Sequence, residues 1–363
     1  MTLVLNDEDV AQVLTIEDTI NALEEAFKEL GQKGAVNAPR RDSFMAVSRP
    51  DTHYSFKTIE GGLESLGVVA QRINSDMITY PKKNAVTRRV KIPAAPGNRY
   101  VGLVYLYSTE SLELLAIITD GHLQRMRVAG TTGVGIRHLS RANARTAALL
   151  GTGWQAETAA WALAAARPLN TIRVFSPDSK NREIFAGKVA DSLGIDVTPV
   201  NSAEEAVQES DIIACATNSS GSVVKGEWVE PGMHLTCIVP NEFDDACWEK
   251  CDLIVCSSPM GTKGFEAYQT GNLLLSSIET MTSQRNVEEK RAKRFKGKRY
   301  MLSDMLIGKA PKRTSSSQIT MMYKNWGLGI EFASVGKLVY DRARSEGIGN
   351  TIPTEWFSQT SHP

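Results

Sequence analysis

The chain contains the stretch Thr146-Ala-Ala-Leu-Leu-Gly151-Thr152-Gly153-Trp154-Gln155-Ala156, in which a short apolar run leads through two glycines into an Ala-rich segment. Gly151 permits a tight turn, and Gly153 lets the backbone approach a ligand with no Cβ atom in the way. Ala156 lets the following helix pack closely on the strand. The free N–H groups and the positive dipole end at the start of that helix favour a pyrophosphate. The stretch therefore predicts a strand–turn–helix unit that binds a dinucleotide.

The sequence after this stretch continues the same alternation. A second apolar segment, Thr171-Ile-Arg-Val-Phe175, follows about 20 residues after the glycines, which is the spacing of a βαβ unit. Further strands are expected at 197–200, 212–216, 235–239 and 253–256, and helices at 155–166, 182–193 and 203–208. Such alternation predicts an α/β fold with a Rossmann-type, doubly wound parallel sheet.

The residues on either side of this region have a different pattern. Apolar positions at helical spacing predict a helix over 16–31, and strand-like runs follow at 68–73, 100–107 and 114–119. A helix at 126–140 then leads into the parallel sheet, and an amphipathic helix is expected at 330–347. The segment 279–299 carries charges of both signs, which is typical of a solvated helix or loop.

Length and charge limit the classes of function. A chain of 363 residues can form two domains with a core each. Lys and Arg together number 41, as do Asp and Glu, so the net charge is zero. Without a broad basic field, neither nucleic acid nor an anionic membrane surface is an expected partner. A small, locally charged ligand fits this composition better.

Membrane, export and metal signals are weak in the sequence. No apolar run approaches the ~20 residues needed to span a bilayer, and the start Met1-Thr-Leu-Val-Leu-Asn-Asp does not resemble a secretory signal. We therefore expect a cytoplasmic protein. The cysteines are odd in number and lack the spacing of a zinc site, so we expect buried free thiols and no metal. They are Cys215, Cys237, Cys247, Cys251 and Cys256.

Short motifs occur along most of the chain besides the glycine loop. They are Asn37-Ala-Pro-Arg-Arg41, Asp120-Gly-His-Leu-Gln-Arg-Met-Arg127, Glu204-Glu-Ala-Val, Ser210-Asp-Ile-Ile, Ala216-Thr-Asn-Ser, Pro231-Gly-Met-His, Lys312-Arg-Thr and Ile319-Thr. Together they resemble the ornithine cyclodeaminase and mu-crystallin family. The resemblance implies a Rossmann NAD(P)-binding domain over 129–319. It also implies an α+β substrate-binding and dimerisation domain built from 1–128 together with 320–363, and hence a homodimer.

The resemblance places two arginines at the substrate. Arg127 matches the position of the family's substrate arginine, and Arg41 matches a second one, with Arg40 as the alternative. A guanidinium offers a fixed fork to a planar carboxylate. Arg127 and Arg41 are therefore expected to bind the carboxylate of the substrate.

The family's lysine has no clear counterpart. The best placement on the strand 68–73 puts Arg72 there, and arginine is a poor general base because it does not lose its proton. Arg72 is therefore expected to stabilise negative charge, which weakens the case for a cyclodeaminase. Lys57 is a second candidate if the loop is aligned differently, although we expect it to be solvated.

The family's catalytic aspartate is also replaced in the best alignment. Its position after the strand 235–239 holds Asn241, followed at once by Glu242. An amide does not exchange a proton as a carboxylate does. Glu242 is therefore a candidate proton donor, with a structural carboxylate as the equal alternative. The proton could also come from water or from the substrate.

The end of the second strand of the parallel sheet bears on the choice of cofactor. Ser176 stands where an acidic residue would bind the ribose of NAD, and Lys180 and Arg182 could meet a 2′-phosphate. NADP(H) is therefore favoured, while Asp178 could restore binding of NAD(H). The remaining cofactor-lining candidates are Gly151, Thr152, Gly153, Trp154, Gln155, Ala156, Thr217, Asn218 and Val239.

These observations predict an NAD(P)H-dependent oxidoreductase that acts on the C–N bond of an imino or amino acid, as an imine reductase or an amino acid dehydrogenase. The expected substrates are a small imino or amino acid, or a 2-oxo acid with an amine. Two alternatives stay open. One is an ornithine cyclodeaminase-type deaminating lyase, and the other is a crystallin-like protein that binds NADPH and a ligand without catalysis.

Overall fold

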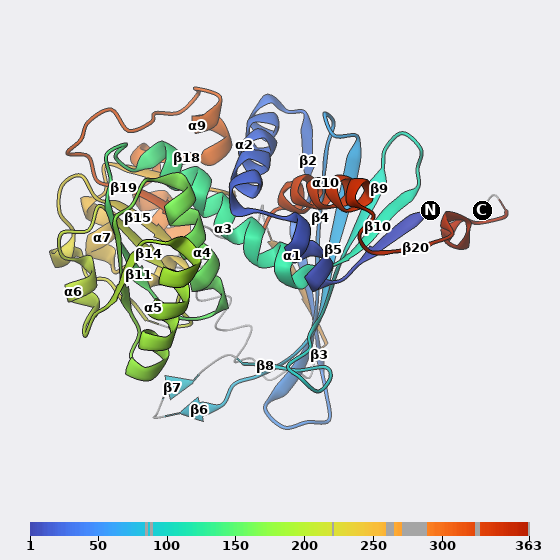
Figure 1. Cartoon of the computed structure of the whole chain (residues 1–363), viewed down its shortest axis with the longest axis horizontal. Helices are drawn as coiled ribbons and strands as arrows, with labels where there is room; N and C mark the ends of the chain where they lie inside the picture. The colour runs from blue at the N-terminus through green and yellow to red at the C-terminus, as the bar shows by residue number, and fades with distance from the viewer. Residues whose placement is uncertain are drawn as a thin grey trace.

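The computed structural model describes residues 1–83, 86–87, 90–219, 221–258, 265–270, 289–323 and 327–361. These residues form two large sheets that lie side by side, each with helices packed on it (Figure 1). The charged segment expected at 279–299 is described only from residue 289 onward.

The sheet that follows the glycine loop is the predicted parallel sheet. Neighbouring strands all run parallel, in the order β13 (Asp196–Pro199), β12 (Thr171–Phe175), β11 (Thr146–Leu150), β14 (Ile212–Cys215), β15 (His234–Cys237), β19 (Thr320–Tyr323), β16 (Leu253–Cys256) and β18 (Arg299–Met301). Its helices include α4 (Trp154–Ala166), α5 (Ser179–Leu193), α6 (Ala203–Val207), α7 (Asp245–Lys250) and α9 (Leu302–Leu306). Separate apolar clusters pack around its strands. The doubly wound α/β fold is therefore confirmed.

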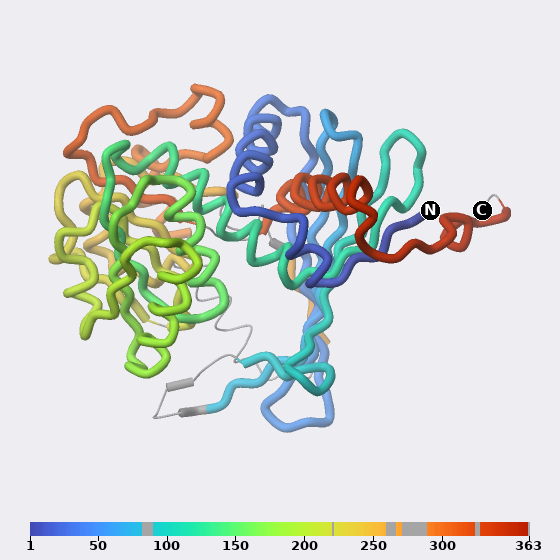
Figure 2. Tube along the Cα trace, viewed as in Figure 1, coloured from blue at the N-terminus to red at the C-terminus, as the bar shows by residue number. Residues whose placement is uncertain are grey.

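The first sheet is mainly antiparallel. Its order is β17 (Phe265–Gln269), β3 (Arg40–Ala46), β4 (Thr52–Leu63), β5 (Val68–Thr79), β9 (Val101–Ser108), β10 (Leu114–Thr119), β1 (Thr2–Leu5) and β20 (Asn350–Ile352). β2 (Ala35–Asn37) pairs with β4 and β8 (Val90–Ile92) with β5, while β6 (Lys82–Lys83) and β7 (Val86–Thr87) form a separate pair. β20 pairs with β1, so both ends of the chain lie at the same edge of this sheet (Figure 2).

Two strands cross the domain boundaries that the sequence predicts. β19 lies inside the parallel sheet, although residues from 320 onward were expected in the other domain. β17 pairs with β3 of the first sheet, although it lies within 129–319. In each case the backbone N–H and C=O groups of the strand find hydrogen-bond partners there. β19 lies between β15 and β16, and β17 lies at the edge of the first sheet, beside β3. The division at 128/129 and 319/320 stays a prediction, with these two strands as exceptions.

Helices cover one face of the first sheet. α10 (Gly329–Glu346) packs across β4 and β5, and α1 (Asp7–Val13), α2 (Ile16–Gln32) and α3 (Asp120–Leu139) lie beside it (Figure 1). One apolar cluster joins residues of both sheets and of these helices, including Ile59, Val255, Met322 and Phe332. The two halves of the molecule therefore share a continuous core.

Two elements extend further than the sequence predicts. β5 continues to Thr79, beyond the expected end at residue 73, because its inward side chains remain buried although several are polar. α3 begins at Asp120, ahead of the expected start at residue 126. Its first turn is capped from elsewhere in the chain, since Asp7 Oδ1 accepts hydrogen bonds from Thr119 Oγ1 (2.8 Å) and the His122 backbone N–H (2.9 Å). Such non-local capping leaves no signal in the local sequence.

The cysteines are free and buried, as predicted. In the described part of the chain, no helix combines the length and the apolar character required to cross a membrane.

A close backbone contact fixes α10 on the first sheet. A Cβ atom at Gly329 would lie 2.0 Å from the carbonyl group of Glu60, and one at Gly61 would lie 2.7 Å from the backbone of Gly329. A side chain at either position therefore requires the helix and the strand to move apart.

We predict that Gly329→Ala lowers the free energy of unfolding by about 2 kcal/mol or more, because the added methyl group overpacks this contact. Gly336→Ala is the matched control in the same helix, since its Cβ would meet only side-chain atoms at 3.8–3.9 Å. The control should be neutral or stabilise by up to about 1 kcal/mol through helix propensity. Chemical denaturation measures both, and equal effects of the two variants would contradict the contact.

Candidate active site

The helix α3 connects the two sheets and carries charged side chains at their junction. Asp120 and Arg127 are seven residues apart, so they lie on one face of the helix. Both are buried. Arg125, on the same helix, lies over the ring of Trp154 in the glycine loop at 5.3 Å. The first sheet and the glycine loop therefore meet along α3.

Arg127 is held by partners on two helices. Its Nη1 donates to Glu331 Oε2 of α10 at 2.7 Å, while Nε (3.1 Å) and Nη2 (2.6 Å) donate to Gln124 Oε1. Glu331 is itself fixed by Thr131 Oγ1 and by the Leu328 backbone N–H. Burial lowers the pKa of Arg127, whereas the charge of Glu331 raises it. The position of the buried Arg127 guanidinium is thus fixed by its hydrogen bonds.

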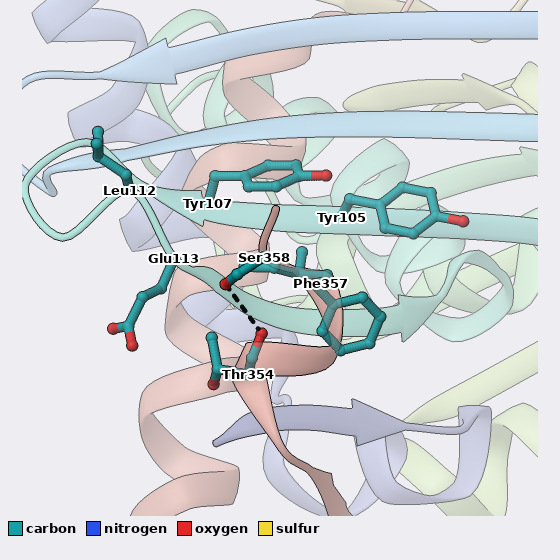
Figure 3. Close-up of a pocket in the computed structure, with 8 residues that line it drawn as sticks. Tyr105, Tyr107, Leu112, Glu113, Thr354, Phe357 and Ser358 are labelled. Carbon is teal, nitrogen blue, oxygen red and sulfur yellow. Dashed lines mark hydrogen bonds between the residues drawn. The ribbon is translucent and has the colours of Figure 1, made fainter. Parts of the chain in front are cut away.

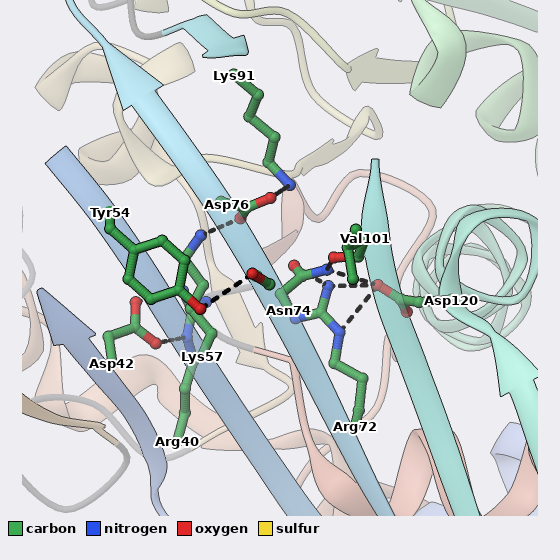
Figure 4. Close-up of polar contacts among 11 residues, drawn as sticks. Arg40, Asp42, Tyr54, Lys57, Arg72, Asn74, Asp76, Lys91, Val101 and Asp120 are labelled. Carbon is green, nitrogen blue, oxygen red and sulfur yellow. Dashed lines mark hydrogen bonds and ion pairs between the residues drawn. The ribbon is translucent and has the colours of Figure 1, made fainter. Parts of the chain in front are cut away.

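A second buried ion pair lies beside it. Arg72 of β5 donates to Asp120 Oδ2 from Nε (3.0 Å) and Nη2 (2.6 Å), and Asn74 Nδ2 approaches the same oxygen at 3.3 Å (Figure 4). Gly102 of β9 leaves the room for this cluster, since a Cβ there would lie 2.5 Å from Asn74 Nδ2 and 2.9 Å from Asp120 Oδ2. Arg72 and Arg127 also share the ring of Phe332, at 5.6 and 4.9 Å.

Lys57 is buried, so the prediction that it is solvated was wrong. Its Nζ donates to Asp76 Oδ2 at 2.6 Å, and Lys91 Nζ lies 2.9 Å from the other oxygen (Figure 4). Burial would raise the pKa of Asp76, but the two lysines hold it below the ordinary value. Lys57 pairs with Asn74 across β4 and β5, so it shares a face of the sheet with Arg72. Cross-strand pairing, which local sequence does not show, places it there.

The two candidate arginines of β3 lie on opposite faces of the first sheet. Arg41 is half exposed and faces Glu60 and Glu266 at 3.9 and 3.3 Å, away from Arg72. Arg40, the alternative, makes a two-pronged contact with the buried Asp42 at 2.7–2.8 Å. Arg40 therefore belongs to the charged face, and Arg41 does not.

The glycine loop has the geometry that a pyrophosphate requires. Gly151 has a φ of +115°, and a Cβ there would lie 2.4 Å from the Ala216 carbonyl oxygen. Gly153 is the N-cap of α4, no side chain caps the helix, and a Cβ at this residue would meet nothing within 4 Å. Open space therefore lies beside Gly153 at the uncapped start of α4, so the loop fits a dinucleotide. Trp154 is about half exposed at the rim, whereas Ala156 is buried, and Gln155 follows in the first turn.

The end of β12 holds the residues expected to select the cofactor. Arg182 is buried, lies over the ring of Phe175, and donates to the Ser176 carbonyl oxygen (2.8 Å) and to Asn201 Oδ1 (3.1 Å). Asp178 caps α5 by accepting from the Asn181 backbone N–H. Lys180 is exposed in the first turn of α5. The guanidinium of Arg182 thus contacts Ser176, whereas the carboxylate of Asp178 is engaged in the cap of α5.

Glu242 joins the ends of β14 and β15. It lies in a short 3-10 turn, Pro240–Glu242, and is fully buried. Oε1 accepts from the backbone N–H (2.7 Å) and the hydroxyl (2.8 Å) of Thr217, and Oε2 accepts from the Val239 N–H (3.0 Å). Burial raises its pKa, and these hydrogen bonds oppose that effect. These contacts favour a structural role for Glu242, which was the alternative to its role as a proton donor in the sequence analysis.

The structure thus brings Arg127, Arg72, Lys57 and Arg40 together on one face. It leaves Asn241 half-buried and Asn218 exposed at the carboxyl edge of the parallel sheet. The sequence did not single out the carboxylates that pair with these cations. They are Asp42, Asp76, Asp120 and Glu331. Polar residues at every second position of β5, namely Arg72, Asn74 and Asp76, were the signal that could have indicated them.

The described residues also form a pocket of about 270 Å³ elsewhere, lined by Tyr105, Tyr107, Leu112, Glu113, Leu114, Thr354, Phe357 and Ser358 (Figure 3). Tyr105 pairs with Gln71 and Val104 with Arg72, so the tyrosine face is opposite to the charged face. Within the described ranges, no group of three His, Cys, Asp or Glu residues could hold a metal ion.

Comparison with known proteins supports the same fold. The sequence model of the ornithine cyclodeaminase/mu-crystallin family matches residues 1–347. A Delta(1)-pyrroline-2-carboxylate reductase from Bacillus cereus is 24% identical over 353 residues, which cover 96% of this chain and 99% of that protein. The structure of a Thermococcus litoralis Delta(1)-pyrroline-2-carboxylate reductase in complex with NADH and L-proline has a TM-score of 0.75 and 24% identity, covering 97% and 100% of the two chains. An archaeal alanine dehydrogenase dimer with bound NAD has a TM-score of 0.74 and 22% identity, covering 97% and 99%.

We predict that Glu242→Gln lowers the free energy of unfolding by about 1–3 kcal/mol. Both oxygens of the carboxylate accept from backbone N–H groups, so the NH₂ group of glutamine must face one of these donors. Glu227→Gln is the control, because that glutamate is exposed. Denaturation curves for the two variants and the wild type test this, and an unchanged free energy of unfolding in Glu242→Gln would contradict the structural role.

Proposed function

The chain belongs to the ornithine cyclodeaminase/mu-crystallin family, and from this membership we propose that it is an NAD(P)H-dependent oxidoreductase acting on the C–N bond of an imino or amino acid. A pyrroline-2-carboxylate reductase and an alanine dehydrogenase among its relatives support the proposal. The observation that carries it is the buried guanidinium of Arg127, placed where the charged face of the first sheet meets the parallel sheet. A fixed cation there suits the carboxylate of a small substrate.

Arg127 can exchange partners when a substrate binds. Its Nε and Nη2 donate to the neutral oxygen of Gln124. A substrate carboxylate in that place replaces a neutral acceptor by a charged one, which strengthens the hydrogen bonds. Glu331 stays on Nη1 and keeps the guanidinium in position. Lys57 and Arg40 lie on the same face, each paired with a buried carboxylate, Asp76 and Asp42.

We further propose that the glycine loop holds the cofactor. Bound NAD(P)H would supply the hydride for the imine carbon. The backbone at Gly151, Thr152, Gly153, Trp154, Gln155 and Ala156 is assigned to the pyrophosphate, and Thr217, Asn218 and Val239 to the side of the nicotinamide. NADP(H) is preferred to NAD(H), because Arg182 lies behind Ser176 and Asp178 is engaged in capping α5. Lys180 is available beside them.

The proposed substrates are a small imino or amino acid, or a 2-oxo acid with an amine. An ornithine cyclodeaminase-type lyase is the second candidate, and Lys57 favours it. The case against that lyase rested on the missing lysine, and Lys57 is a buried lysine on the charged face. A crystallin-like binding protein without catalysis is the third interpretation, which the assay below separates from the other two.

We also propose a homodimer formed through the outward face of the first sheet. Val69, Val101 and Tyr107 on this face are each exposed by about 40%, and half-buried Phe56, Ile73, Leu103, Tyr105 and Ile117 continue the apolar surface. Soluble monomers rarely expose so continuous an apolar surface. A relative that is a dimer supports the same assembly.

We predict a mass of twice 39.7 kDa by light scattering. Tyr107→Arg should shift the protein toward the monomer, because it places a charge in the apolar face. Ile184→Arg is the control, since that residue is exposed on α5 of the other half. A dimer that Tyr107→Arg leaves intact would contradict this interface.

The function is tested by oxidation of NADPH and NADH, side by side, with preformed cyclic imines and with 2-oxo acids plus ammonia or small amines. We predict turnover, faster with NADPH. Arg127→Lys should lower kcat/KM by about 100-fold, because lysine keeps the charge but loses the two-pronged hydrogen bond to the carboxylate. This loss corresponds to about 3 kcal/mol of transition-state stabilisation.

Arg173→Lys is the control for that substitution, since Arg173 belongs to β12 and donates to the Gln208 carbonyl oxygen. Release of ammonia from ornithine without net cofactor consumption would favour the cyclodeaminase instead. Tight NADPH binding with no reaction at all would favour the binding protein.

A further inference from the structure

We propose that Asp120 binds the protonated nitrogen of the substrate, next to the carboxylate that Arg127 binds. This inference rests on the proposed function and names the residue that meets the second polar group of an imino acid. Nothing in the sequence pattern assigned this role, because the residue offered as the proton donor to that nitrogen was Glu242.

The two oxygens of Asp120 differ in their contacts. Oδ2 accepts from Arg72 Nε and Nη2 and lies 3.3 Å from Asn74 Nδ2. Oδ1 is buried and has no hydrogen-bond partner among the described residues. A buried carboxylate oxygen without a donor costs free energy, unless a ligand supplies the donor. One oxygen of Asp120 therefore anchors the side chain, and the other is left for a ligand.

The charge of Asp120 suits a cationic donor. Arg72 supports the negative charge through two N–H groups, and Asp120 is the first residue of α3, where the helix dipole favours an anion. Gly102 keeps the neighbouring strand far enough away for this arrangement. An N–H⁺ group is thus a better partner for Oδ1 than a neutral hydroxyl.

Asp120 and Arg127 together offer the two charges that complement an imino acid. The two residues lie on one face of α3, and a long side chain on a helix leans toward the N-terminus, so the guanidinium approaches Asp120. The charge of Asp120 also acts on the pKa of the buried Arg127, which it raises. A carboxylate and an iminium nitrogen separated by one carbon atom would meet a cation and an anion in that order.

The reaction balances without an acid at residue 241 or 242. The substrate enters as an iminium ion whose N–H⁺ donates to Asp120 Oδ1. Hydride that NAD(P)H would supply, with its oxidation to NAD(P)⁺, would add to the imine carbon and form a C–H bond, and the π electrons of C=N would become the lone pair of the amine. The amine then takes a proton from water. Asp120 stabilises the cation before hydride transfer. Glu242 has no part in the reaction and keeps its structural hydrogen bonds to Thr217 and Val239.

The test compares two planar acids that differ at one atom. Pyrrole-2-carboxylate has an N–H donor beside its carboxylate, and furan-2-carboxylate has an oxygen atom there. Calorimetry with the NADPH-saturated protein should show that the wild type binds the pyrrole at least tenfold more tightly. Equal binding of the two acids, or binding of neither at millimolar concentration, would overturn the proposal.

Asp120→Asn should abolish or reverse the preference, because its oxygen turns to Arg72 and its NH₂ group faces the ligand. Asp211→Asn is the control. Asp211 is a paired carboxylate that accepts from the Arg145 and Thr146 backbone N–H groups, at the amino ends of β11 and β14. The control should retain the preference. A preference retained by Asp120→Asn would contradict the role, and thermal melting verifies that each variant is folded.

The same variants separate this inference from the proposed function. If the wild type reduces no imine but prefers the pyrrole through Asp120, the function fails and the inference on binding stands. If the wild type reduces imines and Asp120→Asn has unchanged kcat and KM, the inference fails and the function stands. We expect turnover in the wild type and a loss of at least 100-fold in kcat/KM for Asp120→Asn.

Discussion

Charges that are taken out of water must be paired, and this requirement organises the junction between the two sheets. Arg127 with Glu331, Arg72 with Asp120, and Lys57 with Asp76 are buried pairs on neighbouring elements. Removing one partner of such a pair costs about 3–5 kcal/mol. Replacing a whole pair by apolar residues is often neutral, so the pairs are weak evidence for stability. Their concentration on the helix-covered face of the first sheet suits the recognition of a charged small molecule.

The supporting structure keeps these charges in place. α3 connects the sheets, Asp7 caps its first turn, and Glu331 ties it to α10. α10 in turn lies against β4 at the contact between Gly61 and Gly329, where no side chain fits. A small movement at that contact would displace Glu331 and, with it, the guanidinium of Arg127. The fold and the site thus depend on the same few contacts.

Much of the parallel sheet could be predicted from the sequence, because β11 to β16 and the helices α4 to α6 follow from local apolar spacing. The strands β18 and β19, which join the same sheet from far along the chain, were not predicted. The glycine loop was also predictable, since the positive φ at Gly151 and the Ala216 carbonyl oxygen 2.4 Å from a Cβ there require glycine. The charged face was not. Lys57 was expected in solvent because its burial depends on partners on neighbouring strands. Asp120 was not recognised as part of a helix, because Asp7, far away in the sequence, caps the first turn of α3. Arg40 and Arg41 could not be separated until the register of β3 was known.

The central claim is that one site binds the carboxylate and the nitrogen of an imino acid between Arg127 and Asp120. A crystal structure with NADPH and pyrrole-2-carboxylate tests it most directly. The account predicts a carboxylate about 3 Å from the guanidinium of Arg127 and a ring N–H at about the same distance from Asp120 Oδ1. An acid bound instead at Lys57 and Lys91, with its nitrogen away from Asp120, would contradict the account.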